Sequence, residues 1–103
     1  MIKVSVMYAH NPNAKFDMNY YVTKHMPMVK QKVGAALKSI EVEQGLSGGA
    51  PGSAPAYVAT GHMYFESVEA FQAAFLPHRK EISADVPNYT DIVPTMQISE
   101  VKL

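Results

Sequence analysis

The chain has 103 residues, enough for one domain with a single hydrophobic core and too few for two. Nine Lys and Arg residues balance nine Asp and Glu residues, so the positive surplus that binds phosphate backbones is missing and nucleic acid is not an expected partner. The absence of cysteine excludes disulfides, thiolate nucleophiles and Cys-ligated metals, and it fits a reducing, cytoplasmic environment.

The first predicted element is a strand over residues 2–9. Apolar and other residues alternate from Ile2 to Tyr8, the period-two pattern of a half-buried strand. This apolar run is too short for a membrane span or a signal peptide, so no membrane association is expected. Turn-forming residues at 10–13 end the strand.

The second predicted element is an amphipathic helix over residues 18–33. Asp17 suits its N-cap, and Gly34 marks its end. On a helical wheel, one arc collects the apolar side chains, which are Met18, Tyr21, Val22, Met26, Met28, Val29 and Val33.

His25 lies inside this apolar arc, so it is expected to face the sheet. Pro27 lies on the solvent side, where its missing N–H leaves the carbonyl of Thr23 open to water and favours a kink. Two interpretations of His25 remain open. It is either a buried neutral imidazole bonded to a carbonyl or a tyrosine hydroxyl, or a pocket residue that transfers a proton near neutral pH. Tyr21, at i−4, is within side-chain reach and is its expected partner.

The rest of the chain predicts three strands, a loop and a second helical region. They are residues 37–46 (strand), 47–56 (loop), 57–66 (strand), 67–75 (helix capped by Ser67), 77–85 (further helical turns after Pro77) and 92–103 (strand). The order β-α-β-β-α-β predicts one α+β domain over residues 1–103 with a ferredoxin-like fold, a four-stranded antiparallel sheet with two helices on one face. Apolar residues are expected on the open face as well, so that a second copy covers it in a homodimer.

Two further histidines are candidate ligand-binding residues. His78 shares a face with Phe75 if the helical phase survives Pro77; otherwise it lies at an exposed, frayed helix end. His62 and Tyr64 share one face of the third strand, which lines either a pocket or the dimer interface. The supply of Tyr and Met, with a glycine in mid-strand, predicts a pocket for a small apolar ligand between sheet and helices.

No cofactor motif is recognisable. The glycine-rich segment 47–56 lacks the GK[ST] of a phosphate loop, and neither an i,i+4 histidine pair nor a nucleophile signature occurs. No cofactor and no metal are therefore expected, although haem binding through a single axial His25 or His78 stays open. Asp85, in the polar segment after the second helix, is expected only to stabilise a loop.

Three segments, FDMNYYVTKHMPMV, YVATGHMYFESVEAF and DVPNYTDI, together resemble the EthD family, named after ethyl tert-butyl ether degradation. This family belongs to the dimeric α/β-barrel superfamily, so the resemblance implies dimerisation through the sheets and a pocket between sheet and helices. His25 and Pro27 match the HxP core of the first motif. Asn88 and Tyr89 match the late loop motif, which implies that Tyr89 belongs to the site. His78 loosely resembles a histidine that several branches place near the end of the second helix.

Three functions follow as hypotheses. The first is a cofactor-independent enzyme, with oxidoreductase, isomerase or cyclase-like activity, or an accessory component of an oxidative degradation pathway. It would bind a small apolar metabolite and use His25 and Tyr21 for acid–base chemistry or hydrogen bonding. The second is a non-catalytic carrier or assembly module, and the third is a haem-binding member of the superfamily.

Overall fold

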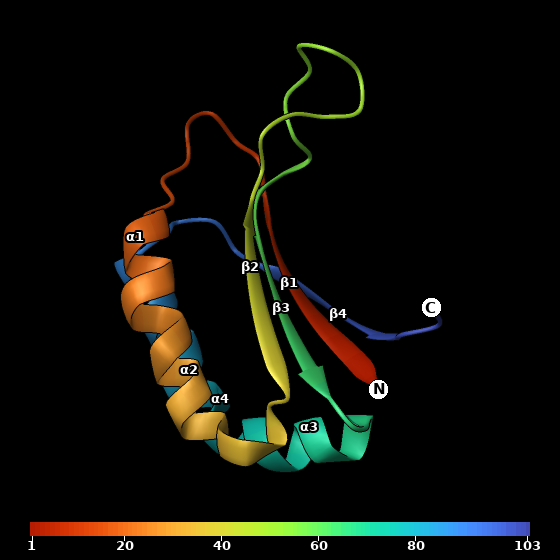
Figure 1. Ribbon diagram of the computed structural model, residues 1–103. Helices are drawn as coiled ribbons and strands as arrows, with labels where there is room; N and C mark the ends of the chain where they lie inside the picture. The colour runs from red at the N-terminus through yellow and green to blue at the C-terminus, as the bar shows by residue number, and fades with distance from the viewer.

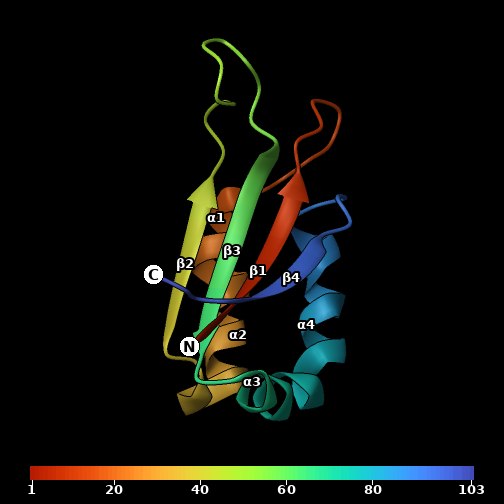
Figure 2. The same ribbon diagram turned by 90° about the vertical axis from the view of Figure 1, so that its right-hand side faces the viewer.

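Four strands form one antiparallel sheet in the computed structural model, which describes residues 1–103. The sheet order is β2-β3-β1-β4, and Figure 2 shows the strands side by side with the helices behind them. The strands are β1 (Ile2–Ala9), β2 (Ser39–Gln44), β3 (Tyr57–Phe65) and β4 (Thr95–Glu100). This is the ferredoxin-like α+β arrangement predicted from the order of the elements. The last strand is shorter than predicted, since residues 92–94 and 101–103 lie outside it.

The first helical run connects β1 to β2 in four pieces. These are α1 (Met18–Tyr20), the π-helical segment η1 (Tyr21–His25), α2 (Met26–Val33) and a 3₁₀ turn (Gly34–Ala36). Asp17 caps the run as predicted, because its carboxylate accepts a hydrogen bond from the amide of Tyr20 at 3.0 Å.

The second helical run connects β3 to β4. It consists of α3 (Val68–Phe75), a 3₁₀ turn (Leu76–His78), α4 (Arg79–Asp85) and a second 3₁₀ turn (Val86–Asn88). The Ser67 hydroxyl accepts from the amide of Ala70 at 3.1 Å, which confirms the predicted cap. Pro77 lies in the first 3₁₀ turn, so it redirects the helix instead of ending it. Figure 1 shows α1 and α2 on one side of the sheet, and Figure 2 places α4 behind β4.

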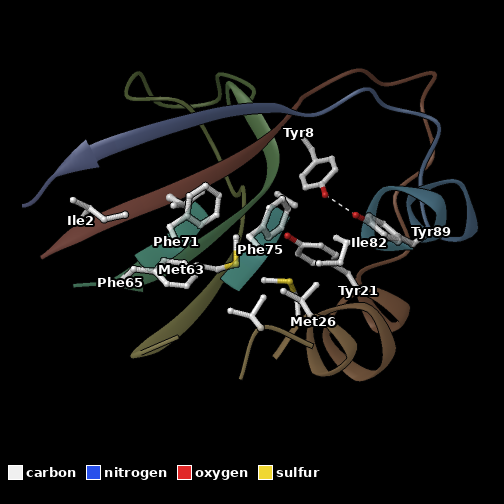
Figure 3. Close-up of a cluster of buried hydrophobic side chains, with 14 residues drawn as sticks. Ile2, Tyr8, Tyr21, Met26, Met63, Phe65, Phe71, Phe75, Ile82 and Tyr89 are labelled. Carbon is white, nitrogen blue, oxygen red and sulfur yellow. Dashed lines mark hydrogen bonds between the residues drawn. The ribbon is translucent and has the colours of Figure 1, made fainter. Parts of the chain in front are cut away.

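The core lies between these helices and the inner face of the sheet (Figure 3). Alternate residues of β1 and β3 point into it, and they are paired across the strands, as in Val4 opposite Met63 and Tyr8 opposite Ala59. The fourteen buried hydrophobic residues are Ile2, Val4, Tyr8, Tyr21, Met26, Val29, Val33, Ala59, Met63, Phe65, Phe71, Phe75, Ile82 and Tyr89.

The open face of the sheet is mainly polar, so the expectation of apolar residues there is met only by a few side chains such as Met7. His62 Nε2 donates to the Glu43 carboxylate at 2.9 Å, and His62 Nδ1 lies 2.9 Å from the Ser5 hydroxyl. The Tyr64 hydroxyl donates to Glu41 at 2.9 Å. Alternation explains the difference, because most of the large apolar residues of these strands occupy the positions that face the helices. None of the helices combines the length and the apolar character that crossing a bilayer requires.

Candidate functional site

The site is centred on a hydrogen bond between His25 and Asp85. His25 Nδ1 lies 2.8 Å from Asp85 Oδ2, and the histidine side chain is almost completely buried. A carboxylate only accepts hydrogen bonds, so the proton of the neutral ring is on Nδ1 and the lone pair is on Nε2. The ring is therefore held in one orientation and one tautomer.

A π-helical turn places His25 at the inner face of the helix. The amide of Met26 donates to the carbonyl of Tyr21, five residues back instead of four. Pro27 explains why the helix widens here, because it has no N–H for the carbonyl of Thr23 and its ring would crowd that carbonyl in a regular α-helix. The turn leaves the rings of Tyr21 and His25 stacked, with 5.6 Å between centroids and 15° between planes.

Burial decides the charge of His25. Desolvation lowers the pKa of His25 below its ordinary value of 6.5, and the hydrogen bond and the charge of Asp85 oppose this effect without outweighing it. His25 is therefore neutral at pH 7. Its neutral form is the one that can accept a proton through Nε2.

Three donors hold Asp85 in its ionised form. Burial raises its pKa, but hydrogen bonds from Asn88, Tyr20 and His25 outweigh that effect, so the pKa of Asp85 lies below its ordinary value. The Tyr20 hydroxyl donates to Oδ1 at 2.7 Å, and Asn88 Nδ2 donates to the same oxygen at 3.0 Å. Asp85 is thus a fixed negative charge behind the imidazole.

Three tyrosine hydroxyls lie beside the hydrogen-bonded pair His25–Asp85, called the dyad below. The hydroxyls of Tyr8 and Tyr89 are 2.6 Å apart and face each other in Figure 3. The Tyr89 ring also packs against His25, with centroids 4.7 Å apart. Burial raises the pKa of Tyr21, Tyr8 and Tyr89, so each phenol keeps its proton at neutral pH and remains a hydrogen-bond donor.

His25 and two of these tyrosines line a cavity of about 80 Å³ between the helices and the sheet. Ser83 and Met96 are exposed, so the cavity reaches the surface between α4 and β4. Its lining contains no charged residue: Val6, Tyr8, Tyr21, His25, Met26, Val29, Met63, Phe75, Ile82, Ser83, Val86, Pro94 and Met96. This apolar space with a few polar groups has the composition of a small-ligand site.

The geometry agrees with a match to known proteins. The model of the EthD domain matches residues 13–92, which include every residue of the dyad and its donors. The chain belongs to the EthD family.

Its relatives extend the match to the whole domain. An EthD-like protein of Ralstonia eutropha JMP134 has a TM-score of 0.95 and 49% identity, covering 99% of this chain and 92% of its own. A protein of Rhodococcus erythropolis, named as an uncharacterized 11.0 kDa protein in the thcB–thcC intergenic region, is 32% identical over 97% of this chain and 94% of its own. A dimeric protein of unknown function and ferredoxin-like fold from Bacteroides fragilis NCTC 9343 shares the fold at 14% identity and a TM-score of 0.51, covering 97% of this chain and 95% of its own.

Four of the predicted site residues of this EthD protein are brought together. His25, Tyr21 and Phe75 line the cavity, and Tyr89 packs on His25. Asp85 is the member that the sequence analysis missed, because it was assigned to a loop. It ends α4, and its partner lies 60 residues earlier in the chain.

The other three predicted residues lie elsewhere. His62 and Tyr64 are on the open face of the sheet, behind the cavity wall. His78 ends a 3₁₀ turn, is half-buried and does not line the cavity, because that turn breaks the helical phase with Phe75. No group of three His, Asp or Glu residues that could hold a metal ion occurs in the chain. The cavity is smaller than one of about 150 Å³ that holds benzene, so it does not enclose a porphyrin.

Proposed function

We propose that this EthD-family protein binds a small, neutral, mainly apolar metabolite in the cavity and transfers a proton between it and His25 Nε2. The observation that carries the proposal is the 2.8 Å bond that fixes His25 Nδ1 on Asp85 while the ring lines the cavity. No cofactor enters this proposal. A place in an oxidative degradation pathway and a cytoplasmic location stay predictions.

The dyad is suited to act as a general base. The lowered pKa of His25 keeps the imidazole neutral, with a free lone pair, at neutral pH. When Nε2 takes a proton, the ring becomes an imidazolium, and the ionised Asp85 behind it stabilises the new charge. Asp85 is therefore a positioning residue, and His25 is the residue that meets the ligand.

The lining of the cavity selects a neutral ligand. An ionised ligand would leave water without meeting a counter-ion, because no Lys, Arg, Asp or Glu lines the space. Ten of the thirteen lining residues are hydrophobic, so most of the ligand surface would be apolar as well.

The same proposal includes a homodimer through the open face of the sheet. This face carries the chain of hydrogen bonds from Ser5 through His62 to Glu43, and a typical interface contains about ten direct hydrogen bonds between polar groups. In Figure 1 the C-terminal segment leaves the sheet on the side away from α1 and α2, in the direction of such a partner. Leu103 and Val101 in this segment are exposed.

The test is an NMR screen with a panel of small neutral ketones, alcohols, esters and phenols. We expect binders to shift the methyl signals of Val29, Met63 and Ile82, which line the cavity. For bound compounds, exchange of an acidic hydrogen in D₂O should be fast with the wild type and slow with His25→Gln and Asp85→Asn. Glu81→Gln is the control, since Glu81 is exposed and bonds Lys32 instead of the dyad.

Binding that shifts these methyl signals without any exchange above the His25→Gln level would identify a carrier. Binding and exchange that are both independent of His25 would make the imidazole a structural group, and the proposed function would be wrong.

A further inference from the structure

Two polar atoms next to the cavity have unused hydrogen-bonding capacity. His25 Nε2 has no hydrogen bond in the protein, since the ring bonds Asp85 through Nδ1. The Tyr21 hydroxyl makes no hydrogen bond within the normal geometric limits; it interacts only with the adjacent Tyr8 hydroxyl, which is itself bonded to Tyr89 at 2.6 Å. Every side-chain nitrogen or oxygen that is completely buried has a hydrogen-bond partner. The two atoms described above therefore border open space, and both residues line the same cavity.

The chain makes room for the Tyr21 hydroxyl. A Cβ atom at Gly61, in the middle of β3, would collide with it, so only glycine allows the phenol to reach the sheet. Tyr21 is 1% exposed, and leaving a buried hydroxyl without a full partner normally costs free energy. The glycine and the incompletely bonded phenol together indicate that this hydroxyl is kept for a ligand.

We propose that the Tyr21 hydroxyl, beside that of Tyr8, binds the oxygen of a small neutral ketone or aldehyde and thereby places the adjacent C–H bond at His25 Nε2. This inference rests on the proposed function and names its substrate class. If Tyr89 donates to Tyr8, the protons of Tyr21 and Tyr8 are both free for one oxygen that accepts two hydrogen bonds, as a carbonyl oxygen does.

The reaction at this position is enolisation. The C–H bond next to the carbonyl breaks, its proton goes to His25 Nε2, and its electron pair forms the C=C bond. The π pair of the carbonyl moves onto oxygen, where the tyrosine hydroxyls stabilise the negative charge. The reverse step returns the proton to the same carbon or, for an isomerisation, to another one, so no oxidant or reductant is needed.

The volume limits the part of the ligand that is enclosed. A cavity of about 80 Å³ is roughly half the size of one that holds benzene. It therefore encloses a carbonyl group and a few carbons, and a longer chain would extend past Ser83 and Met96 to the surface.

A matched pair of probes tests the inference. 2-Butanone and 2-methyl-1-butene have nearly the same shape, but only the ketone carries an acceptor oxygen. We expect the wild type to bind the ketone about three- to tenfold more tightly than the alkene, as one or two neutral hydrogen bonds allow. In Tyr21→Phe this preference should disappear, while affinity for the alkene stays the same or increases. Tyr57→Phe, which removes a hydroxyl from an exposed residue at the start of β3, should keep the preference.

Hydrogen exchange separates this inference from the proposed function. In D₂O, the wild type should exchange the hydrogens next to the carbonyl of 2-butanone faster than His25→Gln, and His25→Gln should still prefer the ketone. Exchange that depends on His25 together with a ketone preference that survives in Tyr21→Phe would leave the proton-transfer function in place and overturn the oxygen-binding role. Equal affinity of the wild type for both probes, or no binding of 2-butanone, would overturn the inference as well. Thermal melting of each variant verifies that it is folded.

Discussion

His25 Nδ1 and Asp85 Oδ2 are 2.8 Å apart, although their residues belong to different helical runs. The bond ties the end of the π-helical segment to the last residue of α4. Both residues also contact tyrosines, since the Tyr20 hydroxyl donates to Asp85 and the Tyr89 ring packs on His25. The orientation of the imidazole therefore depends on the docking of the two helical runs.

Replacing the carboxylate of Asp85 should lower the pKa of His25 further. In Asp85→Asn the desolvation of the ring remains, but the charge that favours the imidazolium is lost. A titration of the His25 Hε1 signal by NMR measures the change. Glu81→Gln should leave the titration unchanged, because Glu81 is bonded to Lys32. A pKa in Asp85→Asn equal to or above that of the wild type would contradict the role of Asp85.

Acid should destabilise the protein through His25. Its pKa is below 6.5 in the folded state and close to 6.5 in the unfolded state, so the unfolded state binds more protons below pH 6.5. The contribution of His25 to stability is therefore complete above that pH and is lost as the pH falls toward the folded-state pKa. Asp85 does not reverse this trend. Its pKa is lowered from 3.8, so its contribution to the free energy of unfolding is lost only as the pH falls below about 3.8.

The measurement is urea unfolding at pH 7.5 and pH 5.5. The free energy of unfolding should fall less between these pH values in His25→Gln than in the wild type. His10→Gln, which removes an exposed histidine, should behave like the wild type. An equal pH dependence of His25→Gln and the wild type would be inconsistent with a neutral buried imidazole.

Gly61→Ala should destabilise the fold by about 1–3 kcal/mol, the usual range for overpacking a core. The new Cβ collides with the Tyr21 hydroxyl, and it lies 3.3 Å from Met26 Cε. The double variant Gly61→Ala/Tyr21→Phe should recover part of the loss, because it removes the atom that is struck first. Urea denaturation of the four proteins in this double-mutant cycle gives the coupling. Additive effects would mean that the two residues do not compete for the same space.

Tyr89→Phe should cost about 1–3 kcal/mol of stability, because it leaves the buried Tyr8 hydroxyl without its partner at 2.6 Å. Tyr8→Phe/Tyr89→Phe removes both hydroxyls and should be less destabilised than the sum of the two single variants. Equilibrium unfolding of the three variants tests this. A strictly additive double variant would show that the hydrogen bond contributes little.

A charged side chain on the open face should disrupt the proposed homodimer. Thr60 lies on this face and donates to Glu43 at 2.9 Å. Analytical ultracentrifugation should give the wild type twice the chain mass of 11.3 kDa and Thr60→Arg a single chain mass. Gln31→Arg, on the exposed side of α2, should remain dimeric. A monomeric wild type, or a Thr60→Arg variant that stays dimeric, would contradict dimerisation through this face.

Local patterns explain how much of the fold could be predicted. Alternation identified β1 and β3, and the caps at Asp17 and Ser67 identified both helix starts, because each signal involves residues within a few positions of one another. The inward position of His25 followed from the same periodicity. The helical continuation after Pro77 was predicted as well and forms α4, since a proline can redirect a helix through a 3₁₀ turn without ending it.

Long-range pairing explains what could not be predicted. Asp85 was interpreted as a loop residue, and no local pattern relates it to a histidine 60 positions earlier. The mainly polar character of the open face was missed because alternation groups the strand residues into two faces without saying which face meets the helices. The π-helical turn at Tyr21–His25 also has no simple sequence signature beyond the proline that follows it.

The distribution of the site along the chain has a practical consequence. The segment from β1 to β2 supplies His25 and Tyr21, and the segment from β3 to β4 supplies Asp85 and Tyr89, with the long connection at residues 45–56 between them. A backbone cut in that connection would produce two fragments that each lack part of the dyad. Fusing them to two interacting proteins would turn this small domain into a split reporter, in which a restored His25–Asp85 contact signals that the fusion partners have met.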